Sequence, residues 1–149
     1  MIALACDHSA LEMKEMVMSL LKERGLPYRD FGTYSCDSCD YPVFAARAAR
    51  AVAAGECERG IVMCGTGIGV SMAANKVPGI RCALCSEPYS AKLTRQHNDS
   101  NMLALGARVI GIELAREIVK TWLDTPFEGG RHARRIALLQ KIENGEPLE

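Results

Sequence analysis

A cysteine followed by three evenly spaced glycines is the part of the sequence best suited to chemistry. In "VMCGTGIGVSMAAN" (62–75), Cys64 ends an apolar run, and Gly65, Gly67 and Gly69 follow at alternate positions. Glycine permits positive φ and close approach of the backbone to a ligand, and amides at the start of a following helix face an anion or a developing oxyanion. A thiol in that setting is suited to act as a base or a nucleophile.

Other interpretations of the same loop stay open. Cys64 at the end of a strand is also compatible with a small buried hydrophobe. The glycine spacing is GxGxG rather than the GxGxxG of dinucleotide-binding loops, and no Lys-Ser/Thr pair of a phosphate-binding Walker loop follows. Glu87 nevertheless lies about as many residues after the glycine loop as the ribose-binding acidic residue of dinucleotide-binding folds, so a nucleotide-binding module is an alternative.

Histidines and acidic residues supply candidate acids and bases. Asp7 and His8 follow the first apolar run, and His97 stands in "RQHNDSN" just before a later one. A histidine in a loop at the active edge of a sheet is a suitable acid or base near neutral pH, and a capping or solvated role is equally compatible. As metal ligands, Asp7, His8, His97 and Asp99 lack a compact HxH or HxxxH spacing, so no metal site is predicted.

Two arginines near the C-terminus form a candidate anion clamp. In "EGGRHARRIALLQKIE", Arg131 and Arg135 are four residues apart and therefore share one face of a helix. Such a pair can grip a phosphate, although alone it would equally be a solvated basic face. Arg108, which follows a predicted strand, is a further candidate.

Short β-prone runs that alternate with longer helical segments must position these residues. This alternation predicts an α/β fold with a parallel sheet and helices on both faces. In such sheets ligands bind at the carboxyl ends of the strands, so Asp7, His8 and the loop 64–69 are expected to converge on one edge. The predicted strands cover 2–6, 60–64, 80–85, 102–106 and a weak one near 26–31; the predicted helices cover 9–25 with Ser9 as its cap, 43–54 with its start set by Tyr41 and Pro42, 87–97, 111–124 and 131–143.

Length and composition indicate one domain over 1–149. Lysine plus arginine equal aspartate plus glutamate at 18 each, so no overall field favours nucleic acid or a membrane surface. No signal peptide and no run of about 20 apolar residues is present, which indicates a cytoplasmic protein whose seven cysteines are free thiols. The pairs Cys36/Cys39 and Cys82/Cys85 do not fit a zinc site, because residues three apart in a strand point to opposite faces.

Five motifs in order together resemble the type B ribose-5-phosphate isomerases, a family that includes galactose-6-phosphate and allose-6-phosphate isomerases. The resemblance covers nearly the whole chain. It implies a three-layer Rossmann-like fold and interconversion of ribose 5-phosphate and ribulose 5-phosphate, in the pentose phosphate pathway, without a cofactor or metal. It also implies a homodimer or homotetramer with active sites shared between subunits and with the helix 131–143 packed across the dimer interface. The motifs are "ACDH" (5–8), "DYP" (40–42), "CGTGIGVSMAANK" (64–76), "SEPYSAKLTRQHND" (86–99) and "EGGRHARR" (128–135).

The resemblance also implies a role for each candidate residue. Cys64 would move a proton between C2 and C1 through a cis-enediolate, and His97, helped by Thr66, would open the sugar ring. One branch of the family uses a glutamate in the glycine loop where this chain has Val70, so the chain falls in the cysteine branch. The other implied ligands are the amides of Gly65, Gly67, Ile68 and Gly69 for the enediolate oxygens, Asp7 and Asn98 for sugar hydroxyls, and Arg108, Arg131, Arg135 and His8 for the phosphate.

The substrate within this family stays open at the sequence level. A hexose 6-phosphate isomerase is the alternative, because pocket length depends on loop geometry. The base, the ring-opening group and the arginines all occur in this one chain, which favours a protein that needs no second kind of subunit.

Overall fold

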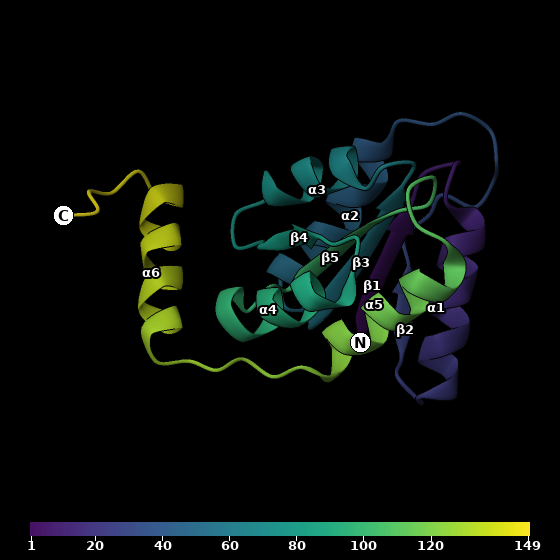
Figure 1. Ribbon diagram of the computed structural model, residues 1–149. Helices are drawn as coiled ribbons and strands as arrows, with labels where there is room; N and C mark the ends of the chain where they lie inside the picture. The colour runs from purple at the N-terminus through teal and green to yellow at the C-terminus, as the bar shows by residue number, and fades with distance from the viewer.

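Five parallel strands form one sheet in the order β2-β1-β3-β5-β4. The computed structural model describes all residues, 1–149 (Figure 1). The strands are β1 Ile2–Cys6, β2 Tyr28–Asp30, β3 Arg59–Cys64, β4 Cys82–Leu84 and β5 Met102–Gly106.

The three central strands are the most buried part of the chain. β1 and β5 are buried at every position and β3 at every position after Arg59, as expected of parallel strands covered on both faces. Their register pairs Cys6 with Met63 and Cys64 with Gly106. The last residues of all three strands therefore meet at the same edge of the sheet.

Helices cover both faces of the sheet and give the three layers. Side chains of α1, α4 and α5 share one apolar cluster with the sheet, and side chains of α2 and α3 share the other. The predicted three-layer Rossmann-like α/β fold is confirmed (Figure 1). The helices are α1 Leu11–Glu23, α2 Tyr41–Ala53, α3 Ile68–Asn75, α4 Pro88–Asn98, α5 Ile112–Asp124 and α6 Arg131–Glu143.

Several predicted element ends differ from the structure by one or two residues, and two of the differences have a clear cause. Ser9 does not cap the first helix, since its hydroxyl donates to Asp7 Oδ1 at 2.6 Å and the helix begins at Leu11. β4 is shorter than the predicted strand 80–85, because the Arg81 amide donates to the side chain of Asn101 (2.8 Å) instead of joining a ladder.

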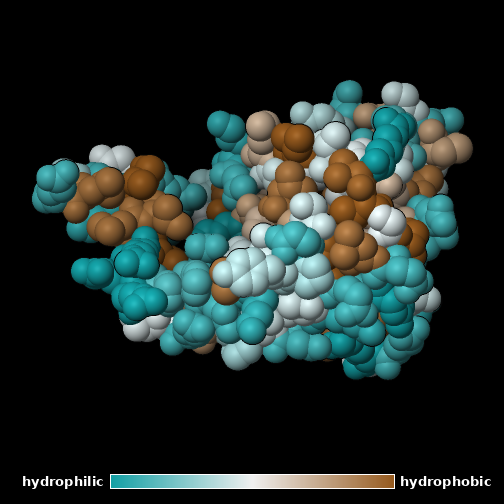
Figure 2. All heavy atoms as spheres, viewed as in Figure 1, coloured by the Kyte–Doolittle hydropathy of each residue, from teal (hydrophilic) through white to brown (hydrophobic).

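The last helix, α6, stands outside the three layers. Figure 1 shows it apart from the body, joined to α5 by an extended segment. Only His132 among its residues is buried. Leu139 and Ile142 are 48% and 58% exposed, and Figure 2 shows hydrophobic side chains gathered on this helix. None of the helices is both long enough and apolar enough to cross a membrane.

Candidate active site

Cys64 lies at the carboxyl end of β3 with its sulfur facing the glycine loop. Its side chain is 5% exposed, and the Gly67 amide donates to Sγ at 3.1 Å. A thiolate accepts such a bond more strongly than a thiol does, because hydrogen bonds to charged acceptors are the stronger ones. The loop therefore presents backbone donors at the sulfur and just beyond it, where α3 begins.

Gly67 is required by this geometry. Its φ is 79°, a left-handed conformation that side chains disfavour. A Cβ there would also lie 2.9 Å from the carbonyl carbon of Leu105 and against the side chain of Leu84. The loop consequently packs directly on the end of β5.

A carboxylate and a guanidinium flank the loop at the same edge of the sheet. Asp7 is 8% exposed, and its Oδ1 accepts from the amide and the hydroxyl of Ser9 at 2.9 and 2.6 Å. The Arg108 amide donates to Gly65 O at 2.9 Å, and its side chain runs along the face of Gly65. The structure thus brings Asp7 to the loop of Cys64, as the sequence predicts, and places Arg108 there as well.

His8 and Tyr41 complete this edge. The Cys39 amide donates to His8 Nδ1 at 3.3 Å, and the Cys39 sulfur lies 3.7 Å from the same nitrogen. The Tyr41 ring covers Gly69 so closely that a Cβ there would lie 2.6 Å from the ring. Tyr41 was predicted only to set the start of a helix, and its position over the glycine loop was not; the motif "DYP" was the available signal.

The remaining candidate residues lie at the other end of the molecule. His97 and Asn98 end α4, a helix that runs back from the sheet's carboxyl edge and delivers the chain to the start of β5 at Met102. Arg131 and Arg135 are on α6, which packs beside α4. His97 lies at the end of the predicted helix 87–97 and not among the residues expected at the carboxyl edge, and a helix between parallel strands ends at their amino edge.

His97 lies against His132 of α6. The two imidazole rings are stacked, with centroids 4.1 Å apart and planes 10° apart. Burial, followed by the charges of His97 and Arg131, lowers the pKa of His132, so it is neutral at neutral pH. A cavity of about 310 Å³ opens beside them, lined by His97, Asn98, His132, Arg135, Ile136 and Leu139.

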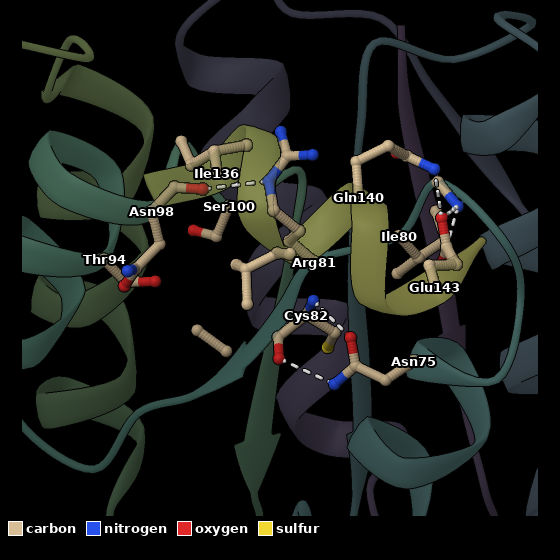
Figure 3. A pocket seen from close by; sticks show the side chains of 13 residues that line it. Asn75, Ile80, Arg81, Cys82, Thr94, Asn98, Ser100, Ile136, Gln140 and Glu143 are labelled. Atoms are coloured by element: carbon tan, nitrogen blue, oxygen red, sulfur yellow. Dashed lines mark hydrogen bonds between the residues drawn. The ribbon is translucent and has the colours of Figure 1, made fainter. Parts of the chain in front are cut away.

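A second cavity, of about 330 Å³, lies between α6 and the edge strand β4. Figure 3 shows Arg81 joined to Asn98 in it, with Gln140 and Glu143 of α6 nearby. Arg81 Nε donates to Asn98 O at 2.9 Å and Nη2 to Asp99 O at 2.9 Å, which fixes the end of α4. Cys64 lines neither cavity, so each chain carries two separate groups of candidate residues.

Known proteins resemble this chain over almost its full length. A family model described as Ribose/Galactose Isomerase matches residues 2–139. The ribose-5-phosphate isomerase B of Escherichia coli is 52% identical over 95% of each chain. The structure of Clostridium thermocellum ribose-5-phosphate isomerase B superposes with a TM-score of 0.95 at 51% identity over 97% of both chains. That of the Mycoplasma genitalium enzyme with bound ribulose 5-phosphate gives 0.92 at 39% identity, over 96% of this chain and 95% of the other.

Proposed function

Because this chain belongs to the ribose/galactose isomerase family, we infer that it is an aldose–ketose isomerase that interconverts ribose 5-phosphate and ribulose 5-phosphate. The observation that carries the inference is Cys64, held beneath a loop of backbone donors inside a fold shared with enzymes of that name. A cysteine in that position suits a reaction that moves one proton between adjacent carbons.

The loop geometry supports proton transfer through a cis-enediolate. We propose that the Cys64 thiolate takes the proton from C2 of the open-chain aldose while the electrons move onto the C1 carbonyl oxygen. The proton of the C2 hydroxyl then passes to that oxygen, and the same thiol returns its proton to C1 as the C2 carbonyl forms. Negative charge that develops on the sugar oxygens is met first by the amides of Gly65 and Gly69, because in this structure the Gly67 amide donates to Cys64 Sγ and the Ile68 amide to Thr66 Oγ1. Amide donors at such a loop stabilise oxyanions. These steps use only groups of the protein, and we propose that no cofactor or metal takes part.

The surroundings of Thr66 and Asp7 support a role for both residues in binding the sugar at this edge. Thr66 is exposed, and its hydroxyl accepts from the Ile68 amide at 3.2 Å, so its O–H remains free to donate to a ligand. Asp7 is fixed through one oxygen by Ser9. We propose that Asp7 binds a hydroxyl group of the sugar, that His8 and Arg108 help to bind the phosphate, and that Thr66 supports ring opening.

The ring-opening and phosphate-binding groups require a second copy of the chain. His97, Asn98, Arg131 and Arg135 lie at the opposite end from Cys64, so one chain cannot bring both groups to one sugar. We propose a homodimer, or a dimer of dimers, in which His97 of one copy opens the ring beside Cys64 of the other while the arginines hold the phosphate.

Exposed apolar surfaces support this assembly. Leu139 and Ile142 are exposed on α6, and Ile68 and Met72 of α3 are 47% and 63% exposed next to the glycine loop. Figure 2 shows hydrophobic side chains on α6 and again over the region of α3. Exposed apolar patches of this kind mark interaction surfaces. If α6 of one copy packs against α3 of a second copy, Arg131 of the first lies closer to Cys64 of the second.

The proposed cellular location follows from the thiols. All seven cysteines are unpaired. Free thiols persist in reducing compartments, so we propose that the protein works in the cytoplasm.

The test is an isomerase assay in deuterated water with EDTA, using ribose 5-phosphate and, separately, allose 6-phosphate and galactose 6-phosphate. We expect ketose formation fastest from ribose 5-phosphate, with solvent deuterium at C1. Cys64→Ala is expected to remove most turnover with the fold intact, while the control Cys36→Ala, at an exposed thiol, leaves turnover unchanged. No turnover of any of the sugars, together with tight binding of NAD or ATP by calorimetry, would instead identify a nucleotide-binding module.

A further inference from the structure

Three side chains that ligate metals meet at the junction of α4 and α6. The ligand atoms of His97, Glu128 and His132 all lie within 4.8 Å of one another. None of the three side chains makes a hydrogen bond, although His132 is only 6% exposed. No buried side-chain nitrogen or oxygen lacks a partner, so the unbonded ring nitrogens of His132 reach solvent beside a second imidazole and a carboxylate, where a ligand can approach them.

The backbone holds these residues in place from two elements. The Glu128 amide donates to Gln96 O at 3.1 Å, which ties the segment before α6 to the residue next to His97. Glu128 and His132 are four residues apart, with Oε2 and Nε2 separated by 3.6 Å. Two donors about 2.0–2.2 Å from one tetrahedral ion are about 3.4 Å apart, so this pair already has the required spacing.

His97 supplies the third donor after a rotation of its ring. In this structure its ring is parallel to that of His132, so their in-plane lone pairs do not converge. The ring is half-buried and unbonded, so it can turn about Cβ–Cγ without breaking a hydrogen bond. Two imidazoles and a carboxylate are a donor set that Zn²⁺ accepts, with a water in the fourth position.

We propose that His97, Glu128 and His132 form a binding site for a zinc-type divalent cation. The neighbouring Arg131 and Arg135 repel a cation, so we expect weaker binding than at a structural zinc site. Because the ion takes the His97 lone pair, its binding inhibits the isomerase; this consequence, unlike the site itself, rests on the proposed function.

The site is tested directly by titrating chelator-treated protein with Co²⁺, in a buffer without phosphate, and by measuring Zn²⁺ binding by calorimetry. We expect one ion per chain and the visible absorption of four-coordinate Co²⁺ without a thiolate-to-metal band. His132→Gln and Glu128→Gln are each expected to weaken binding by about tenfold or more, since even outer-shell partners contribute that much. Glu12→Gln, at an exposed acid of α1, is the matched control.

Absence of saturable binding, a thiolate band, or equal affinity in all the variants would overturn the proposal. Inhibition is then measured as the ratio of ribose 5-phosphate turnover with and without Zn²⁺, for the wild type and for Glu128→Gln. We expect reversible inhibition, relieved by EDTA, at higher Zn²⁺ in the variant; bound Zn²⁺ without inhibition would overturn the inhibitory role. The absorption of bound Co²⁺ reports metal binding whether or not the protein is an active isomerase. A failure of the isomerase assay would therefore not affect the test of the metal site.

Discussion

The surroundings of its sulfur distinguish Cys64 from the other buried cysteines. Cys64 receives a backbone N–H in a loop of glycines, whereas Cys6 and Cys85 lie within the apolar core. Burial raises the pKa of both Cys6 and Cys85 to about 11. A buried neutral thiol of this kind is inert, so the core cysteines have a packing role.

Alkylation of the native protein at pH 8 checks this difference. We expect iodoacetamide to modify Cys36, which is exposed, and to leave Cys6 and Cys85 unmodified, since they are buried and protonated at that pH. Peptide mass spectrometry gives the rate at each position. Modification of the two core thiols as fast as Cys36 would contradict the packing.

His132 gives a prediction in pH. Its pKa is lowered, first by burial and next by His97, so the folded protein resists its protonation. The stabilisation from the neutral ring is present above the unfolded pKa and is lost as the pH falls through the lower folded value. An NMR titration should place the His132 midpoint below about 6.5, and His97→Gln should raise it. A midpoint above that of a free histidine would show that the ring is neither buried nor next to His97.

At the scale of elements, the glycine loop is the most constrained connection. Gly67 and Gly79 both have positive φ, 79° and 90°, but only Gly67 has backbone atoms where a Cβ would be. We expect Gly79→Ala to cost about 1 kcal/mol for the left-handed conformation alone. Gly67→Ala should cost about 2–4 kcal/mol, because it adds overpacking against β5. Urea unfolding measures the loss in the free energy of unfolding for each variant. Equal losses would mean that the backbone at Leu105 shifts at no cost to accept the added methyl group.

Sequence patterns predicted the elements well where packing is simple. The strands 2–6 and 102–106 and the helix 131–143 have the predicted bounds, because apolar runs bounded by turns and a helix opened by two glycines are unambiguous. The predicted start of the first helix at Ser9 was wrong, since the Ser9 hydroxyl donates to Asp7 instead of capping the helix. That choice depends on a side chain that the local pattern does not specify.

The site was only half predictable from the sequence. Strand ends at one edge follow from parallel topology, so Asp7 and the loop that begins at Cys64 were correctly predicted to meet. The position of His97 at the opposite edge was inferable from the direction of α4, but the stacking on His132 was not. The stacking depends on the path of the extended segment before α6, which decides where α6 lies. Hydrophobic periodicity does not determine that path.

At the scale of the whole molecule, α6 is the element that needs a partner. Replacing both Leu139 and Ile142 by glutamate puts two charges on its exposed apolar surface. We expect a folded monomer with little turnover, because the phosphate arginines no longer reach the other copy. Sedimentation velocity and circular dichroism measure assembly and folding. Leu26→Glu, an exposed leucine between α1 and β2, is the control and should leave the assembly unchanged.

The central claim is that Cys64 and His97 act together across two copies of the chain. Cys64→Ala and His97→Gln proteins would each be assayed alone with ribose 5-phosphate, then mixed, unfolded, refolded together and assayed again. If the sites are shared, half of the dimers are mixed and each has one intact site of two, which predicts about a quarter of wild-type activity. A mixture as inactive as the two separate variants, despite normal assembly, would show that each site lies within one chain and would contradict the account.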